Sequence, residues 1–386
     1  MRILLSACPL YGHVNPVLAL AVAAREAGHD VVVATGPELV PHVARAGVEA
    51  WAVGSVPPPA AVAGAEPDWL AWFVTSARER AADLVPRAAR WRPGLVVAEE
   101  TDLAGMVAAT AGGARLAVHG LGIMPAPAVL DACVAAVADL HRQWALPFDS
   151  GAFRAATYLE VWPAAMRPAG ARPWPGATPL RPAVAGDPTA GRRTASGGWL
   201  SRALDGLPYA DTVHLTLGTV FHGDRPVLAA ALDGLRELPV NVVVAVGPGA
   251  DPASLGEQPA HVLVAPYLPY PELLPRCRAV VSQGGAGVLL AGLAHGLPQL
   301  AVPLGADQAR NAAACRDAGA GLVLEPPEVA AESLAGAVAG AVARLLGEAS
   351  FAASAREVAA ALAAMPAAGP VVAELARQAD SVAARR

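Results

Sequence analysis

Short apolar runs alternate with longer segments of helical spacing along most of the chain. Such runs are typical of strands in a parallel sheet, because helices cover both faces of that sheet. The first unit has a strand at Ile3–Ala7, a helix at Val17–Ala27 and a strand at Val31–Thr35. Asn15 is expected to cap this helix, with Pro16 at its first position. Two buried strands joined by a helix predict parallel pairing and a right-handed crossover.

The alternation continues in two halves of similar size, separated by an irregular Pro- and Gly-rich connector over Pro163–Pro208. The first half adds expected helices at Pro37–Ala46, Trp69–Arg92 and Leu103–Ala111, and strands at Glu49–Val53, Leu95–Ala98 and Arg115–His119. The second half has expected strands at Thr212–Leu217, Val240–Val246, His261–Val264, Ala279–Ser282 and Leu300–Val302, and helices at Arg225–Leu235, Glu328–Leu346, Phe351–Ala364 and Gly369–Ala383. This pattern predicts the α/β class with two doubly wound domains and a ligand site in a cleft between them.

Charge and composition narrow the possible functions. The net charge is −5 and no basic run is present, so nucleic acid is not an expected partner. All 28 basic residues are arginine, which excludes a P-loop ATPase because that motif requires lysine. The uncharged run Ala279–Ala306 is long enough to span a bilayer, but its paired glycines and two prolines favour buried strands, so no membrane span is expected. Four scattered cysteines indicate reduced thiols in the cytoplasm, and neither they nor the histidines have the spacing of a metal site.

His13 is the sharpest candidate for proton chemistry, since it lies between a buried strand and a helix N-terminus. The positive end of the helix should keep the imidazole neutral, which suits a general base. Glu99 and Glu100 follow the strand Leu95–Ala98 and reach the same sheet edge, where a carboxylate would orient the imidazole and stabilise its charged form. The alternatives are a histidine that only bonds the backbone and a pair of rim acids, with Asp102 the better helix cap.

Polar and glycine residues follow three expected strands of the second half and should meet at one sheet edge. They are Gly218 and Thr219, the run Ser282 to Gly287, and Asp307 with Gln308. Gly284, Gly285 and Gly287 precede or open a helix, where free N–H groups and the helix dipole form an anion site. Thr219 can donate to a phosphate, and Asp307 with Gln308 offers the donors and acceptors that sugar hydroxyls need. Asp307 taken alone is equally well explained as a helix cap.

Three segments carry a resemblance to a known family: PLYGHVNPVLALAVAAREAGHDVVVAT, LTLGTV and LLPRCRAVVSQGGAGVLLAGLAHGLPQLAVPLGADQARNA. They resemble actinobacterial natural-product glycosyltransferases of the GT-B class. The resemblance implies two facing Rossmann-like domains, an acceptor-binding domain at residues 1–205 and a donor-binding domain at 206–366. The C-terminal helix, 367–386, would pack back on the first domain.

The resemblance also implies the reaction, an inverting transfer of a deoxysugar from a nucleoside-diphosphate sugar, by family habit dTDP-linked, to a hydroxyl of a hydrophobic aglycone. His13 would be the base and Glu99 its orienting carboxylate. The donor would bind to Thr219, Tyr267, Gln283, Gly284, Gly285, Gly287, Asp307 and Gln308, with Tyr267 stacking on the nucleobase. The sugar nucleotide is a co-substrate, so no cofactor and no metal are expected, and a homodimer is compatible with the family.

Two residues depart from the family pattern. Where relatives read HHGGAGT this chain reads SQGGAGV, so Gln283 replaces a histidine and carries no charge. Glu99 replaces an aspartate and lengthens the orienting side chain by one methylene. Three alternatives stay open: C-glycosylation of an aromatic ring, sugar-nucleotide epimerisation, and a non-catalytic sugar-nucleotide-binding partner. The aromatic residues within 51–73 and 121–162 are explained equally well as an acceptor pocket or as core.

Overall fold

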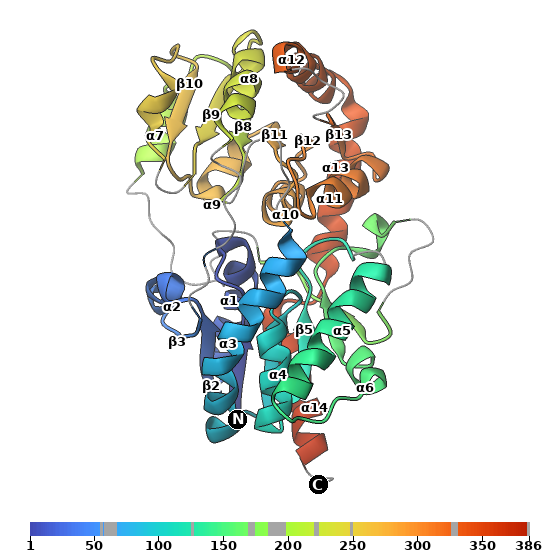
Figure 1. Ribbon diagram of the computed structural model, residues 1–386. Coiled ribbons are helices and arrows are strands. Elements are labelled where there is room, and N and C mark those ends of the chain that lie inside the picture. Colours follow the sequence, from blue (N-terminus) through green and yellow to red (C-terminus); the bar gives the residue numbers. More distant parts are fainter. Residues whose placement is uncertain are drawn as a thin grey trace.

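Two parallel β-sheets, each covered by helices, form the two halves of the chain in the computed structural model (Figure 1). The structure describes residues 1–54, 57, 68–124, 127–168, 174–183, 198–219, 224–247, 250–325 and 331–383. The first sheet has seven strands in the order β3-β2-β1-β4-β5-β6-β7, and the second has six in the order β10-β9-β8-β11-β12-β13. The prediction of two doubly wound α/β domains is therefore confirmed.

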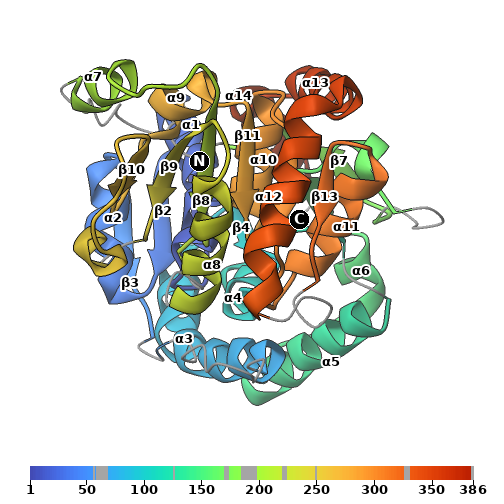
Figure 2. The ribbon, with the colours of Figure 1, turned by 90° about the horizontal axis from the view of Figure 1, so that it is seen from above.

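The strands of the first sheet are β1 (Arg2–Ser6), β2 (Asp30–Thr35), β3 (Glu49–Ala52), β4 (Leu95–Glu99), β5 (Arg115–His119), β6 (Thr157–Glu160) and β7 (Ala177–Pro179). The helices of this half are α1 (Tyr11–Glu26), α2 (Val40–Arg45), α3 (Trp69–Trp91), α4 (Leu103–Gly112), α5 (Pro127–Gln143) and α6 (Ser150–Arg154), with short 3-10 turns at Pro37–Leu39 and Ala164–Met166. Alternate residues of β4 face opposite cores, so Val97 packs with α1 while Val96 packs with α3 and α4. Figure 2 shows α3, α4 and α5 on one side of this sheet and α1 on the other.

The strands of the second sheet are β8 (Thr212–Thr216), β9 (Asn241–Ala245), β10 (Val262–Ala265), β11 (Ala279–Ser282), β12 (Gln299–Ala301) and β13 (Gly321–Val323). The helices are α7 (Trp199–Asp205), α8 (Arg225–Arg236), α9 (Tyr270–Leu273), α10 (Ala286–Ala294), α11 (Gln308–Asp317), α12 (Ala331–Gly347), α13 (Ala349–Ala364) and α14 (Ala368–Ala383), with 3-10 turns at Pro252–Leu255 and Leu274–Arg276. β11 lies between β8 and β12, so the glycine loop that follows it sits near the middle of the sheet edge.

The start of α1 differs from the sequence prediction. The helix begins at Tyr11, and the N–H groups of His13 and Val14 both donate to the Leu10 carbonyl. Asn15 is therefore inside the helix and does not cap it; its Oδ1 instead lies 2.6 Å from His42 Nε2. Pro16 removes one backbone N–H donor from the helix. The helix continues through Pro16 because its buried side chains pack against the sheet and offset that loss.

The last helix, α14, returns to the first half of the chain. It packs on α1, β4 and β5, where Val372 and Leu375 meet Ile3, Leu20 and Val97. Figure 1 shows α14 beside the first sheet, far from α12. Its apolar face therefore completes the core that α1 begins.

The uncharged run Ala279–Ala306 folds as β11, α10 and β12, as the glycine and proline positions favoured. Among the described residues, no single helix is long and apolar enough to cross a membrane. One pair, Ser333–Gly347 with Ala349–Ala364, passes the same criteria jointly and is bent by 74° at its break.

Candidate functional site

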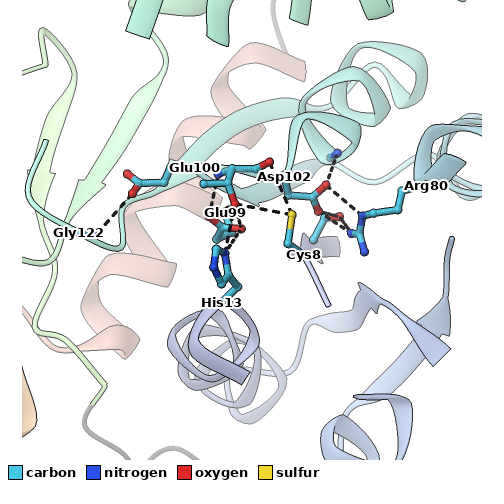
Figure 3. A network of polar contacts seen from close by, with 10 residues as sticks. Cys8, His13, Arg80, Glu99, Glu100, Asp102 and Gly122 are labelled. Atoms are coloured by element: carbon cyan, nitrogen blue, oxygen red, sulfur yellow. Dashed lines mark hydrogen bonds and ion pairs between the residues drawn. The ribbon is translucent and has the colours of Figure 1, made fainter. Parts of the chain in front are cut away.

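His13 and Glu99 form an ion pair at the carboxyl edge of the first sheet (Figure 3). His13 lies in the first turn of α1, Glu99 ends β4, and His13 Nδ1 lies 3.0 Å from Glu99 Oε2. Thr101 fixes the carboxylate: its backbone N–H donates to Oε1 at 2.7 Å and its hydroxyl lies 2.9 Å from each oxygen. Glu99 is fully buried, whereas the imidazole keeps 17% of its surface exposed. The Nδ1–H is thus held by Glu99, and within the described residues Nε2 is the nitrogen left to accept a proton.

The electrostatics of the pair favour charge on both partners. Burial alone lowers the pKa of His13, but the Glu99 charge and hydrogen bond outweigh it, so the pKa is raised. Burial raises the pKa of Glu99, and the His13 charge with the Thr101 bonds outweighs it, so that pKa is lowered. The prediction that the helix N-terminus keeps the ring neutral was therefore wrong in direction. A full carboxylate charge 3.0 Å away exceeds the half-charge of a helix end.

Glu100 points to the other side of the strand end and belongs to a second hydrogen-bond group. The Tyr158 hydroxyl donates to its Oε2 at 2.6 Å, and the Gly122 N–H donates to its Oε1 at 3.3 Å. Burial raises the pKa of Glu100 to about 7; the Tyr158 bond opposes the rise and the Glu99 charge adds to it. Glu100 thus links β4 and β6 to the loop that follows β5, which is a definite role beyond that of a rim acid.

A buried ion pair supports the turn that carries Glu99 and Glu100. Arg80 from α3 donates to Asp102 with a 2.7 Å contact at Oδ2, and the Ser6 hydroxyl donates to the same oxygen (Figure 3). Asp102 also caps α4 by accepting from the Gly105 N–H, as the sequence predicted. Because both ions are buried and hydrogen-bonded, loss of one partner would leave an uncompensated charge beside the site.

An aromatic group covers the side of His13 that faces α3. Trp69, Trp72 and Phe73 pack together, and the Phe73 ring centroid lies 5.8 Å from that of His13. Trp72 is buried with Cys8 and Leu10, whereas Phe73 is only partly buried. The Trp72 side of the group is core, and the Phe73 side adjoins the histidine.

The glycine loop of the second half has the predicted form. Gly284 follows β11 with φ +87°, a left-handed conformation that side chains resist, and Gly285 is the N-cap of α10. Gly287 lies in the first turn of that helix, where N–H groups have no intrahelical acceptor. The loop therefore presents backbone donors at a helix N-terminus.

Gln283 is buried between two glycines of this edge. A Cβ at Gly218, where φ is +71°, would come within 2.2 Å of Gln283 Nε2, and one at Gly285 within 2.8 Å. Within the described residues, Gln283 Oε1 has no hydrogen-bond partner. Thr219 directly follows Gly218, so these polar groups share one sheet edge, as the sequence predicted.

Asp307 and Gln308 open α11 with different contacts. Gln308 Oε1 accepts from the N–H groups of Leu304 and Gly305 at 2.7 and 3.1 Å, which closes the loop after β12. Asp307 occupies the N-cap position but its side chain makes no capping bond; its Oδ2 accepts from Asn311 Nδ2 at 2.7 Å. The capping interpretation of Asp307 is therefore not supported.

The two sheet edges meet at Asp307. A Cβ at Gly122, in the loop after β5, would lie 2.5 Å from Asp307 Oδ2, and the Asp307 charge contributes to the raised pKa of His13. The structure thus brings His13, Glu99 and Glu100 near Asp307. Tyr267 is separate: it is 57% exposed in the segment between β10 and α9, and no contact among the described residues joins it to the others.

Sequence reasoning missed Thr101 and Asn311, and it counted Tyr158 only among the aromatic residues of 121–162, without its hydrogen bond to Glu100. Thr101 follows the Glu99-Glu100 pair at the strand end, a position that could have drawn attention to it. Tyr158 lies in a strand that the pattern did not reveal, and Asn311 looks like an ordinary helical residue. Among the described residues, no group of three His, Cys, Asp or Glu side chains has the arrangement of a metal site.

A family model and two sequence relatives all compare this chain with proteins of antibiotic biosynthesis. Residues 229–378 match the family model of the erythromycin biosynthesis protein CIII-like C-terminal domain. The chain is 35% identical to an L-demethylnoviosyl transferase of Streptomyces niveus over 339 residues, covering 84% of this chain and 85% of the relative. It is 33% identical to the elloramycin glycosyltransferase ElmGT of Streptomyces olivaceus over 362 residues, covering 85% and 87%.

Solved structures with the same fold span nearly the whole chain. The glycosyltransferase VinC in complex with dTDP has a TM-score of 0.78 at 25% identity, over 99% of this chain and 100% of that one. The glycosyltransferase SnogD from Streptomyces nogalater has a TM-score of 0.76 at 28% identity, over 98% and 99%. The two-domain arrangement is thus that of GT-B glycosyltransferases.

Proposed function

The chain belongs to the family of antibiotic, natural-product glycosyltransferases, and we propose that it performs an inverting transfer of a deoxysugar from a dTDP-linked donor to a hydroxyl of a hydrophobic aglycone. The observation that carries the proposal is the contact of His13 with the buried Glu99 carboxylate at a sheet edge that meets Asp307 of the other half. A base held by a carboxylate, opposite a polar loop with free backbone donors, fits hydroxyl activation beside a sugar nucleotide.

His13 Nε2 accepts the proton of the acceptor hydroxyl, and Glu99 stabilises the imidazolium that forms. The acceptor oxygen forms a bond to the anomeric carbon while the bond from that carbon to the diphosphate oxygen breaks on the opposite face. The configuration at the anomeric carbon inverts, and the nucleoside diphosphate leaves with the bonding electron pair. Support comes from the 3.0 Å contact that orients His13 through Nδ1 and leaves Nε2 for the acceptor.

The donor lies along the edge of the second sheet. The N–H groups at the start of α10, near Gly285 and Gly287, with Thr219 and Gln283, meet the charge that develops on the diphosphate. Asp307 and Gln308 hold the sugar hydroxyls, and Tyr267 stacks on the base. Fixed donors of this kind contribute about 3–4 kcal/mol each to the transition state, so the reaction is proposed to need no metal. The solved relative VinC carries dTDP, which supports the choice of nucleotide.

The acceptor lies against the partly buried Phe73, next to His13. An apolar aglycone would cover this ring and exclude water from the histidine. The similarity to an elloramycin glycosyltransferase supports a natural-product acceptor.

The proposal is tested with purified protein, a panel of dTDP- and UDP-sugars, and hydroxycoumarin, anthraquinone and macrolactone acceptors, read by mass spectrometry. We expect a glycosylated product with dTDP donors and an anomeric configuration opposite to that of the donor. Retained configuration would overturn the inverting mechanism, and sugar conversion without acceptor would indicate an epimerase. Products that survive acid hydrolysis would assign a C-glycosidic bond.

A further inference from the structure

Asn311 joins three parts of the site with one amide. It is fully buried in α11, and its Nδ2 donates to Asp307 Oδ2 at 2.7 Å and to the Gly284 carbonyl at 3.4 Å. Its Oδ1 accepts at 2.9 Å from the N–H of Ile123, which belongs to the other half of the chain. The donors and the acceptor of this side chain are therefore all engaged.

The loop that Asn311 contacts is held firmly on its own side. Trp162 Nε1 donates to the Leu121 carbonyl at 2.9 Å, and the Gly122 N–H donates to Glu100. The loop also approaches Asp307 and Asn311 closely: a Cβ at Gly122 would lie 2.5 Å from Asp307 Oδ2 and 3.2 Å from Asn311 Oδ1, so a side chain there would force the Asp307 carboxylate to shift. At this point the two halves are therefore joined by hydrogen bonds and by close packing.

We propose that Asn311 is a positioning residue that couples contact between the two halves to recognition of the donor sugar. The Asn311 amide orients the Asp307 carboxylate through Nδ2. Its Oδ1 accepts from the Ile123 N–H, so the same side chain holds that carboxylate beside the Gly122–Ile123 loop. Sugar binding at Asp307 then depends on the first half being in place, which keeps the donor sugar aligned with His13. The inference rests on the proposed function for the role of Asp307, whereas the contact between the halves stands independently of it.

Two substitutions separate the two bonds. Asn311→Ala removes both the donor to Asp307 and the acceptor for Ile123. Asn311→Asp keeps an acceptor for the Ile123 N–H but places a second carboxylate against Asp307, and like charges at this distance repel. Loss of a hydrogen bond to a charged group corresponds to about a 10- to 100-fold change in an equilibrium constant.

The experiment measures three quantities on the full chain: KM for a dTDP-deoxysugar in transfer, Kd for dTDP by calorimetry, and hydrogen exchange at Ile123. We expect Asn311→Ala to raise KM about 10-fold or more and to speed Ile123 exchange, with the dTDP Kd nearly unchanged. Asn311→Asp should raise KM while Ile123 exchange stays slow. Gly122→Ala, which keeps the Asn311 amide but crowds Asp307 Oδ2 and, less closely, Asn311 Oδ1, should also raise KM.

Asn241→Ala is the matched control, because Asn241 is also a buried, fully bonded asparagine of the second half but lies at the opposite sheet edge, bonded to Tyr209 and Thr212. Asn241→Ala should lower Tm, and it should not cause a rise in donor KM that exceeds any rise in the Kd for dTDP. Unchanged KM and Ile123 exchange in Asn311→Ala would overturn the inference, as would equal rises in KM and dTDP Kd. If the wild-type chain transfers no sugar, the proposed function fails, and Ile123 exchange still decides whether Asn311 joins the halves.

Discussion

His13 acts in the proposed reaction through a single nitrogen, because Glu99 holds the other. Thr101 in turn holds Glu99 with its backbone N–H and its hydroxyl, so the carboxylate is fixed before any substrate binds. The orientation of the base is therefore built into the turn between β4 and α4 and needs no rearrangement.

Removal of the imidazole should abolish proton transfer but spare donor binding. His13→Ala is expected to lower kcat by about 10²- to 10⁴-fold, the usual contribution of a general base, with the Kd for dTDP unchanged by calorimetry. His29→Ala, at the opposite end of α1, is the control and should keep wild-type kcat. Transfer by His13→Ala at near the wild-type rate would show that another group is the base.

The pH profile of transfer should reflect the carboxylate beside the base. Only neutral His13 accepts a proton, so kcat/KM should rise with pH through the raised pKa of His13, above the ordinary value of about 6.5. Glu99→Gln removes the charge that raises this pKa while burial, which lowers it, remains, so the rise should move to lower pH as kcat falls. Asp149→Asn, a charge change at the exposed cap of α6, should leave the profile in place. A rise at the same pH in Glu99→Gln would contradict the coupling of the pair.

At this scale the sequence predicted residue types better than their partners. His13 and Glu99 could be paired because the parallel strands of one sheet end at the same edge, and β1 and β4 are neighbours there. The contacts of Thr101 and Asn311 depend on side-chain directions and on the meeting of the two halves, which no local pattern contains. The predicted direction of the His13 pKa shift was wrong for the same reason, because that direction depends on the distance between His13 and Glu99.

Among the elements, the loop between β11 and α10 requires a glycine at its turn. Gly284 adopts φ +87°, and a Cβ there would lie 3.1 Å from the Gln308 carbonyl of the neighbouring loop. The same residue supplies the carbonyl that Asn311 contacts, so its conformation affects both donor-binding loops.

A side chain at Gly284 should therefore weaken donor binding beyond its effect on stability. Gly284→Ala is expected to cost about 1–2 kcal/mol of folding free energy from the left-handed backbone and to raise the dTDP Kd by about 10-fold or more. Gly296→Ala, with φ +68° at the other end of α10, should lower Tm similarly with dTDP Kd unchanged. Equal dTDP affinities for the two variants, measured by calorimetry, would show that the loop does not hold the nucleotide.

Most elements could be predicted from apolar runs, but β6, β7 and β13 could not. β6 and β7 contain polar residues and β13 begins with a glycine, so none of the three stands out as an apolar run as the equally short β11 and β12 do. These three strands pair because neighbouring strands already offer an edge. The start of α1 was misplaced because Asn15-Pro16 is a strong local signal for a helix start, yet burial of Val14 and Val17 extends the helix past it.

For the molecule as a whole, α14 is the element that ties the end of the chain to its beginning. It follows α13 of the second half, yet it packs on α1, β4 and β5 of the first. Arg181 holds the bend between the two helices by donating to the carbonyls of Ala363 and Met365.

Truncation of an α14 side chain should thus destabilise the half that is distant in sequence. Leu375→Ala is expected to cost about 2–5 kcal/mol and to speed hydrogen exchange in β1 and β4. Leu362→Ala makes the same deletion in α13, which packs on α10, and should speed exchange there instead. If Leu375→Ala accelerated exchange chiefly in the second sheet, α14 would belong to that half.

Because α14 returns, the second half is an insertion into the first. One junction lies before α7, whose Leu200 and Leu204 pack in the second half, and the other lies between Ala364 and Ala368. A chimaera that exchanges sugar-nucleotide specificity between relatives therefore needs two crossovers. A single crossover would bring a foreign α14 onto the native α1, and the graft would fail at Leu20 and Val97, far from either substrate.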